Sequence, residues 1–329
     1  MINIGIVGYG NLGKGVMKAC RCHPDMRLKA LFTRRNPTDI VLPDQGPGKP
    51  VPVVPIEQAL DWHDRIDVMI LCGGSAKDLP EQGPHFASAF NTVDSFDTHA
   101  KIPEYFRRVD EAARQGGNLS LVSSGWDPGL FSLARVLFGS VLPDGQDFTF
   151  WGRGVSQGHS DAIRRIPGVV DARQYTQPVE QAVAAARSDN PPAMTTREKH
   201  LRECFVVADE GADRETIRQA IVTMPHYFAD YDTSVTFVSR AELAEQHAAL
   251  PHGGFVIRNG KTSDGTRQIA EFSLRLDSNP EFTSSVLTAY ARAIYQMRLD
   301  GRTGAVTVLD VPPGLLSPKS AEELRATLL

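Results

Sequence analysis

The sequence predicts two folded parts, an α/β domain with a parallel sheet and an α+β domain with an open, mixed and mainly antiparallel sheet. The first half of the chain alternates short apolar strand segments with helical stretches, a pattern typical of a parallel sheet. From about residue 147 strand-like segments predominate, with two helical stretches between them. A length of 329 residues also exceeds that of one small domain.

The first part is predicted to contain five strands and three helices. The strands lie over residues 2–7, 28–32, 67–71, 91–94 and 119–123, and the helices over 14–22, 57–63 and 102–115. The proline-rich segment 37–55 is predicted as a loop. Ligands bind beyond the carboxyl ends of parallel strands, so three segments are candidate ligand loops: 72–75, 95–99 and 123–129.

The second part has six predicted strands and then returns to the first part at its end. The strands lie over residues 147–151, 172–176, 204–208, 234–239, 254–257 and 268–276, and the helices over 214–223 and 280–299. Residues 305–309 are strand-like and residues 317–328 helical, and we expect this tail to pack on the first domain. The predicted domains are therefore residues 1–125 completed by 305–329, and residues 126–304.

Composition argues against several classes of partner. A net charge of −4 gives no reason to expect nucleic acid or a membrane surface. No apolar run approaches the roughly 18 residues that span a bilayer. The chain enters a strand at once, without a signal-peptide pattern, so we expect a cytoplasmic protein. The four cysteines lack metal-site spacing and are expected to be buried, reduced thiols without a metal: Cys20, Cys22, Cys72 and Cys204.

A glycine-rich turn follows the first strand. Gly8, Gly10 and Gly13 fit the G-x-G-x-x-G pattern, in which the first glycine allows a tight turn and the second lets a pyrophosphate approach the backbone. The third glycine lets the helix pack closely on the strand, and the helix N-terminus favours the negative phosphate. The sequence therefore predicts a Rossmann-type dinucleotide-binding domain.

The residues after the second strand distinguish between the two nicotinamide cofactors. An NAD enzyme carries an acidic residue about twenty residues beyond the loop, where this chain has Thr33, Arg34 and Arg35. Guanidinium groups bind phosphate oxygens in a bidentate fork, so the pattern favours NADP(H).

Three aspartates are candidates for chemistry beside a nicotinamide. Asp94 and Asp97 lie with His99 in one predicted loop, where a carboxylate could hold or deprotonate a substrate ammonium. Loop aspartates also cap turns and helices, so both roles stay open for Asp97. Asp127 precedes Pro128, a pattern typical of a helix N-cap, and it also follows a predicted strand.

Residues 151–161 are predicted as the end of a strand followed by a glycine-rich loop, whose backbone amides could bind a carboxylate. By themselves, Arg202 and His252 are lone polar residues, typical of a surface or a satisfied core. The chain has no serine-hydrolase elbow and no phosphate-binding loop of the NTPase type.

Several longer motifs resemble those of the meso-diaminopimelate D-dehydrogenase family. They lie at residues 6–13, 124–129, 156–162, 164–169, 204–209, 224–225 and 251–254, and the resemblance extends to residues 316–318. It implies a homodimer that uses NADP(H), with residues 126–304 forming a substrate-binding and dimerisation domain. The implied reaction is reversible oxidative deamination of meso-2,6-diaminopimelate at its D-centre to L-2-amino-6-oxopimelate and ammonia.

The resemblance also implies site residues. Cofactor contacts fall on the glycine turn and four later segments: Gly8, Tyr9, Gly10, Asn11, Leu12, Gly13, Thr33, Arg34, Arg35, Cys72, Gly73, Gly74, Ser75, Ser95, Phe96, Asp97, Ser124, Gly125, Trp126, Asp127 and Pro128. Substrate contacts fall on Asp97, Asp127, Trp151, Gln157, Gly158, Thr176, Arg202, His252 and Asn279. We expect Asp97 to act as the base and Asp127 to orient the amino group or water.

Two departures from the family pattern are small. Thr33 stands where the family has serine, and residues 72–75 have glycine where a methionine is familiar. The second departure leaves open a D-amino-acid dehydrogenase of relaxed specificity. A non-catalytic NADPH-binding module is the alternative of a different class.

Overall fold

The computed structural model describes residues 1–43 and 50–329, which divide into two compact units. The first unit contains Met1–Leu133 and Pro280–Leu329, and the second contains Ala134–Asn279. These limits differ from the predicted ones, because the long helix near residue 290 belongs to the first unit. Its Leu287 and Tyr290 are buried in the core of that unit, and a helical pattern alone does not say against which sheet a helix packs.

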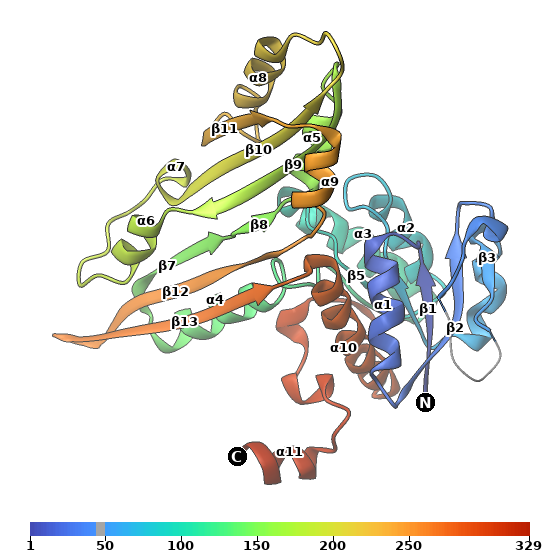
Figure 1. The fold of residues 1–329 in the computed structure, drawn as a ribbon. Coiled ribbons are helices and arrows are strands. Elements are labelled where there is room, and N and C mark those ends of the chain that lie inside the picture. Colours follow the sequence, from blue (N-terminus) through green and yellow to red (C-terminus); the bar gives the residue numbers. More distant parts are fainter. Residues whose placement is uncertain (44–49) are drawn as a thin grey trace. The chain divides into compact units, whose positions relative to one another are not determined.

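The described residues of the first unit form a seven-stranded sheet in the order β14-β6-β5-β4-β1-β2-β3 (Figure 1). Its strands are β1 (Ile2–Val7), β2 (Met26–Thr33), β3 (Val53–Pro55), β4 (Val68–Leu71), β5 (Thr92–Asp94), β6 (Leu119–Leu121) and β14 (Gly304–Val306). Every neighbouring pair is parallel, which confirms the predicted sheet. From β1 the chain continues to β2 on one side and later to β4 on the other, so the strand order reverses at β1. Ligands of such sheets bind at this point.

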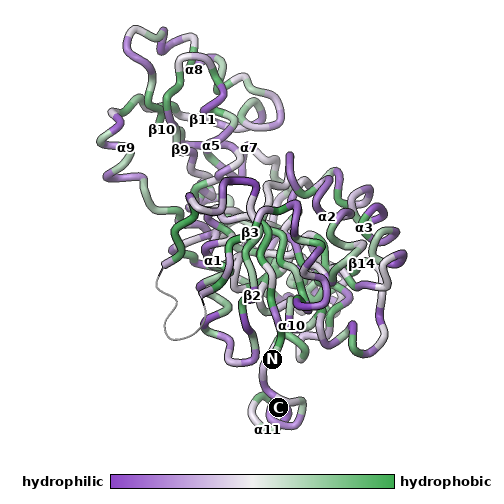
Figure 2. The backbone as a smooth tube through the Cα atoms, turned by 90° about the vertical axis from the view of Figure 1, so that its right-hand side faces the viewer, coloured by the Kyte–Doolittle hydropathy of each residue, from purple (hydrophilic) through white to green (hydrophobic). Residues whose placement is uncertain are grey.

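Alternating side chains of these strands fill two cores. Ile4 and Ile6 of β1 contribute to one core, with residues of α1 (Asn11–Arg21) and α10 (Asn279–Leu299). Met69 and Leu71 of β4 contribute to the other, with α2 (Leu79–Ala87) and α3 (Ile102–Gly116). Figure 2 shows hydrophobic strand segments inside this unit and more hydrophilic stretches on the helices around them. This is the three-layer arrangement of a Rossmann-type domain.

The second unit, all of whose residues are described, contains a four-stranded sheet in the order β11-β10-β9-β8 and a three-stranded sheet in the order β13-β12-β7. The strands are β7 (Asp144–Trp151), β8 (Gly154–Val155), β9 (Val169–Pro178), β10 (His200–Ala208), β11 (Asp232–Phe237), β12 (His252–Ser263) and β13 (Thr266–Leu276). All pairs are antiparallel except β10 with β11, so the prediction of a mixed, mainly antiparallel arrangement is confirmed.

The remaining helices include several that the sequence pattern did not predict. They are α4 (Leu130–Val141), α5 (Gln157–Arg164), α6 (Glu180–Ala186), α7 (Thr196–Lys199), α8 (Arg214–Val222), α9 (Arg240–Gln246) and α11 (Ala321–Leu328). The predicted glycine-rich loop is wrong from Gln157 onward, because helix α5 begins there. Ser156 caps this helix, and its side chain accepts a hydrogen bond from the backbone N–H of His159.

The predicted loop over residues 37–55 contains a short 3-10 helix and strand β3, and its residues 44–49 lie outside the described residues. The predicted helix over residues 57–63 is a 3-10 helix, Ile56–Arg65.

The C-terminal tail packs on the first unit through Val306, Val308 and Val311, as predicted. In helix α11, by contrast, no residue is buried among those described.

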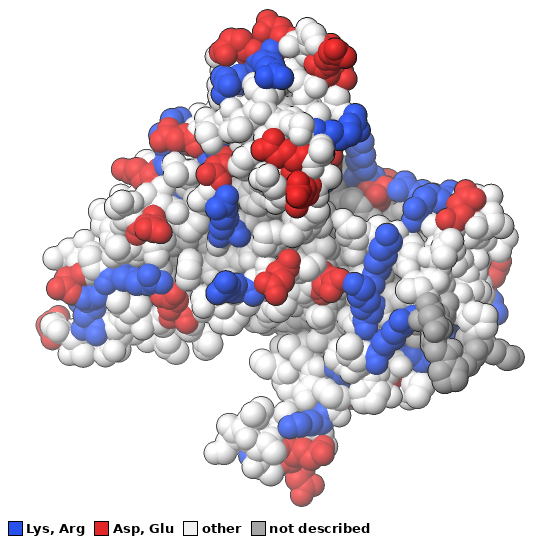
Figure 3. Space-filling view, in the orientation of Figure 1, with Lys and Arg blue, Asp and Glu red and all other residues white. Residues whose placement is uncertain are grey.

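Three further expectations from composition can be compared with the structure. No described helix is long and apolar enough to cross a membrane. Figure 3 shows acidic and basic side chains scattered over a face that is mostly uncharged. Cys20 and Cys204 are buried as expected, but Cys72 is half-buried and Cys22 is exposed, so the expectation of a buried thiol is wrong at Cys22 and only partly met at Cys72.

Candidate functional site

The glycine turn of the first unit has the geometry that dinucleotide binding requires. Gly8 adopts φ +93°, and its N–H donates to the carbonyl of Phe32 at 2.8 Å. A Cβ on Gly13 would lie 2.1 Å from the carbonyl oxygen of Gly8, so only glycine allows helix α1 to approach the turn this closely. A Cβ on Gly10 would meet no atom of the described residues within 4 Å. The space in front of Gly10 is therefore open to a pyrophosphate.

A pocket of about 360 Å³ lies over this turn, and its lining includes Thr33, Arg34 and Arg35. Thr33 is buried, and its hydroxyl accepts a hydrogen bond from the backbone N–H of Arg35 at 3.1 Å. The guanidinium of Arg35 donates to the carbonyl of Tyr9 at 2.7 Å, which directs it toward the glycine turn. Helix α1 has no acidic residue in its first turn, so nothing there opposes a phosphate. Its first turn contains Asn11 and Leu12.

Two residues that sequence reasoning missed line the same pocket. Asp78 pairs with Arg34 at 2.8 Å and accepts a hydrogen bond from the N–H of Gly74 at 2.8 Å, so it links two of the predicted cofactor segments. The Oε1 of Gln82 is buried without a partner, and a Cβ on Gly73 would lie 2.5 Å from it. Both belong to or border helix α2, which was not predicted.

The loops after β4, β5 and β6 are tied together at the carboxyl edge of the sheet. Asp94 is fully buried and accepts hydrogen bonds from the N–H of Phe96, the N–H of Ser123 and the hydroxyl of Tyr105, at 2.9, 3.0 and 2.6 Å. Burial raises the pKa of Asp94. This aspartate therefore anchors two loops and is not a free base.

Asp97 differs from Asp94 in being exposed. Its backbone N–H donates to the hydroxyl of Ser75 at 2.8 Å, and that hydroxyl lies 3.2 Å from the hydroxyl of Thr98. Neither the 3-10 turn at His99 nor helix α3 is capped by a side chain, so the capping alternative for Asp97 is excluded. Ser95 precedes Phe96 in the same loop.

Asp127 is half-buried in a tight turn that a bridge between Trp126 and Gly129 closes. Helix α4 begins at Leu130, so the predicted N-cap role of Asp127 is wrong. Trp126 is buried and packs edge-on against Phe131, with ring centroids 5.2 Å apart. The hydroxyl of Ser124, which precedes this turn with Gly125, is buried without a partner and is thus available to a ligand.

The second unit contains a buried guanidinium that lacks a counter-ion. Arg202 of β10 is 6% exposed, and no carboxylate among the described residues forms an ion pair with it. Its guanidinium donates to the hydroxyl of Thr176, and the ring of Tyr231 lies 3.9 Å from it. Burial lowers the pKa of Arg202. Burial of an unpaired charge costs free energy, so an anionic ligand would stabilise this site.

Other predicted substrate residues lie around Arg202. The backbone N–H of Trp151 donates to Nε2 of His200 at 2.9 Å, and the two rings stack at 5.1 Å. Burial and the charges of Arg202 and Lys199 lower the pKa of His200 to about 3. His252 lies against Gly154, where an added Cβ would come 2.4 Å from the ring. Gly154 is in register with Thr176.

For three further predicted substrate residues, the structure shows the position of the backbone. Gln157 and Gly158 form the exposed first turn of α5, and the N–H of the preceding Ser156 donates to the carbonyl of Gln174 at 3.0 Å. Asn279 begins α10, and its N–H donates to the carbonyl of Leu250 at 2.9 Å. Their contact with substrate stays a prediction.

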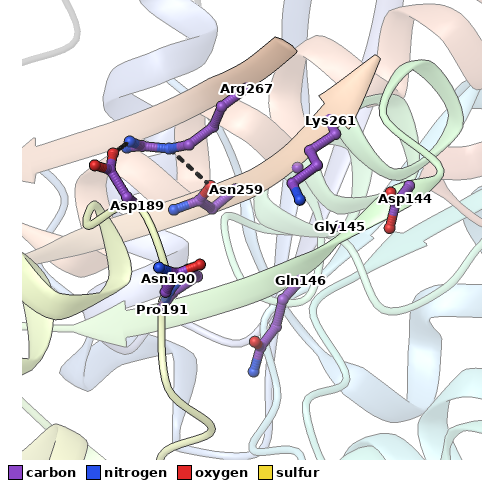
Figure 4. Close-up of a pocket in the computed structure, with 10 residues that line it drawn as sticks. Asp144, Gly145, Gln146, Asp189, Asn190, Pro191, Asn259, Lys261 and Arg267 are labelled. Atoms are coloured by element: carbon purple, nitrogen blue, oxygen red, sulfur yellow. Dashed lines mark hydrogen bonds and ion pairs between the residues drawn. The ribbon is translucent and has the colours of Figure 1, made fainter. Parts of the chain in front are cut away.

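A separate pocket of about 320 Å³ lies at the far end of the β7 and β12 pair (Figure 4). Arg267 forms an ion pair with Asp189 and donates to Oδ1 of Asn259 at 3.3 Å. None of the buried polar atoms that lack a partner, among the described residues, belongs to the lining of this pocket. We assign it no ligand.

Comparisons with known proteins support one family. Residues 125–278 match the family model of the diaminopimelic acid dehydrogenase C-terminal domain. The chain is 59% identical over 328 residues to the meso-diaminopimelate D-dehydrogenase of Ureibacillus thermosphaericus, covering 100% of this chain and 99% of the relative.

Two solved structures are also similar over the whole chain. A multiply substituted meso-diaminopimelate dehydrogenase of Clostridium tetani, with DAP, is 55% identical, has a TM-score of 0.94 and is covered completely, as is this chain. An engineered D-amino acid dehydrogenase bound to NADP+ is 44% identical with a TM-score of 0.89, covering 100% of this chain and 99% of that one.

Proposed function

Because the chain belongs to the meso-diaminopimelate D-dehydrogenase family, we propose that it catalyses reversible oxidative deamination of meso-2,6-diaminopimelate at the D-centre. The products are L-2-amino-6-oxopimelate, ammonia and NADPH. This reaction serves the formation of lysine and cell-wall precursors, and a cytoplasmic location is consistent with it.

The observation that carries this proposal is the buried, unpaired guanidinium of Arg202. Diaminopimelate has two carboxylates, and the one distant from the reacting carbon supplies the missing anion. An arginine with a hydroxyl beside it binds a carboxylate through charge-assisted hydrogen bonds. Arg202, Thr176 and His252 are therefore assigned to the distal carboxylate.

The Clostridium tetani relative supports the assignment of further residues to substrate binding. Its six substituted positions have the same original residue types, at the same intervals along the chain, as Gln157, Thr176, Arg202, Pro251, His252 and Asn279 here. We assign Trp151, Gln157, Gly158 and Asn279 to the substrate with the three residues above.

The cofactor site is proposed to hold NADP(H). The open space at Gly10 and the buried free hydroxyl of Ser124 both fit such a ligand. Arg34 and Arg35 would bind the 2′-phosphate, and the segments at residues 8–13, 72–75, 95–97 and 124–128 would contact the rest. Bound NADP+ supplies the hydride acceptor for the reaction.

Asp97 is proposed as the base that takes a proton from the substrate ammonium, since only a neutral amine can release hydride from its carbon. Its exposure in a loop at the carboxyl edge of the sheet supports this role, and Asp94 is excluded because its oxygens are already bonded. Asp127 would orient the amino group or the water that hydrolyses the imine.

A homodimer is the proposed assembly. Helix α4 exposes Val136, Leu137 and Val141 at 52%, 59% and 59%, which is typical of a face that another subunit covers. Sedimentation of the full chain at several concentrations would test this.

The test of function is reduction of NADP+ by the purified protein with meso-, LL- and DD-diaminopimelate and with simple D-amino acids. We expect rapid reduction with the meso isomer, little with LL, and little with NAD+. Comparable rates with simple D-amino acids would favour the relaxed dehydrogenase that the glycines of residues 72–75 leave open. NADPH binding without reduction by any amine would indicate a non-catalytic binding module.

A further inference from the structure

A row of three side chains crosses the four-stranded sheet at Arg202. Arg202 on β10 has two register partners, Thr176 on β9 and Thr233 on β11 (Figure 1). Side chains at paired positions leave a sheet on the same face. Thr176, Arg202 and Thr233 therefore lie next to one another on one face. Only the first two were predicted as substrate residues.

The two threonines differ in their hydrogen bonds. The hydroxyl of Thr176 accepts from Nη1 of Arg202 and from Nε2 of Gln174, the latter at 3.4 Å. A hydroxyl has two lone pairs and one hydrogen, so both acceptor positions of Thr176 are filled and its hydrogen is left for an acceptor. The hydroxyl of Thr233 is buried and has no partner in the part of the chain that the structure describes.

Arg202 also retains an unused donor. Its Nε is buried without a partner, and the ring of Tyr231 covers the guanidinium. Tyr231 lies two residues before Thr233 and directly precedes β11. Buried polar groups in folded proteins are almost always bonded, and three unused donors in one row indicate an acceptor ligand.

We propose that Thr233 is a further substrate-binding residue, whose hydroxyl donates to the carboxylate held by Arg202. Nε of Arg202 and the hydroxyl of Thr176 donate to the same carboxylate. This inference rests on the proposed function, since the ligand is the distal carboxylate of diaminopimelate. It adds a contact on β11 that neither the motifs nor the comparisons indicate.

The test compares Thr233→Val with Thr233→Ser and with Thr236→Val. Valine keeps the shape of threonine and removes the hydroxyl, while serine keeps the hydroxyl. Thr236 lies on the same strand but on its opposite, exposed face, so Thr236→Val is a matched control. We expect Thr233→Val to raise the KM for meso-diaminopimelate about tenfold, with kcat and the Kd for NADPH changed less than about twofold.

The outcomes distinguish this proposal from that of the overall function. Restoration of KM by serine, with no effect of Thr236→Val, supports a bond from the Thr233 hydroxyl to substrate. An unchanged KM in Thr233→Val, in an otherwise active enzyme, overturns the proposal. So does a joint loss of kcat, NADPH affinity and thermal stability in both Thr233 variants. An inactive wild-type protein would instead refute the proposed function.

Discussion

The arginines of the two units differ in whether the protein itself supplies their bonding partners. In the first unit Arg34 is paired with Asp78 and Arg35 with a backbone carbonyl, and the side chain of Arg34 is 65% exposed. In the second unit Arg202 is buried, has no ion pair and is surrounded by unpartnered polar atoms. The arginines of the proposed cofactor site are thus bonded within the protein itself, whereas Arg202 at the proposed substrate site requires a ligand to become satisfied.

The arginines of both units are proposed to bind ligands and not to transfer protons. The largest loss of turnover is therefore expected at Asp97. Asp97→Asn removes the proposed base and keeps the shape, and kcat should fall about 10²- to 10⁴-fold. The Kd for NADPH, measured by fluorescence titration, should change little because Asp97 carries no assigned phosphate contact. Turnover near the wild-type value would refute the assignment.

Two glycines of the turn provide a matched pair of substitutions, one expected to affect folding and the other cofactor binding. Gly13→Ala places a methyl group 2.1 Å from the carbonyl oxygen of Gly8, and overpacking of this kind costs about 1–3 kcal/mol or more. Gly10→Ala meets no protein atom, so stability should fall by less than about 1 kcal/mol.

Urea unfolding and NADPH titration of the two glycine variants provide the measurement. Gly10→Ala should weaken NADPH binding while the protein stays folded, and Gly13→Ala should lower stability. Equal loss of stability in both variants would contradict the open space assigned to Gly10.

Acid should destabilise the second unit because of its buried histidines. The pKa values of His159 and His200 are lowered to about 3, mainly by burial, below the value of about 6.5 in an unfolded chain. Both histidines are neutral when folded, so their contribution to stability is complete above about pH 6.5 and is lost as the pH falls toward 3. At pH 5 the loss is about 2 kcal/mol for each histidine.

Hydrogen exchange of the β10 amides between pH 7 and pH 5 measures this effect, after correction for the intrinsic exchange rates. The His200→Gln variant should show a weaker pH dependence than the wild type. Identical pH dependence in both proteins would contradict a buried neutral His200.

The smallest effect is expected at Arg34. In its ion pair with Asp78 the side chain of Arg34 is 65% exposed and that of Asp78 18%, and ion pairs near the surface contribute about 0–1 kcal/mol to stability. Arg34→Ala should therefore leave Tm nearly unchanged while it weakens NADPH binding about tenfold and NADH binding much less. If the binding of NADPH and of NADH is weakened equally, Arg34 does not bind the 2′-phosphate.

Local motifs made the proposed cofactor site more predictable than the proposed substrate site. Gly8, Gly10 and Gly13 act within one turn, and Arg34 and Arg35 follow the adjacent strand, so their spacing along the chain carries their role. Asp78 could not be found in this way. It borders α2, where Pro80, Gly83 and Pro84 hide the helical pattern, although Gly83 allows close approach to Tyr105.

The proposed substrate site depends on register between strands that are distant in sequence. Thr176, Arg202 and Thr233 become neighbours only when β9, β10 and β11 pair, and no spacing in the chain predicts that register. The family resemblance supplied Thr176 and Arg202. Helix α10 was placed in the wrong unit for a related reason, since an apolar stripe does not identify the core that it will join.

We propose that the two units bind different ligands through different arginines. The most direct test measures the Kd for NADPH and the KM for meso-diaminopimelate, at saturating NADP+, in Arg35→Ala and Arg202→Met. We predict that Arg35→Ala weakens NADPH binding at least about tenfold with little change in substrate KM. Arg202→Met should raise substrate KM about a hundredfold with an unchanged Kd for NADPH. An unchanged substrate KM in Arg202→Met, or an equal loss of NADPH affinity in both variants, would contradict the account.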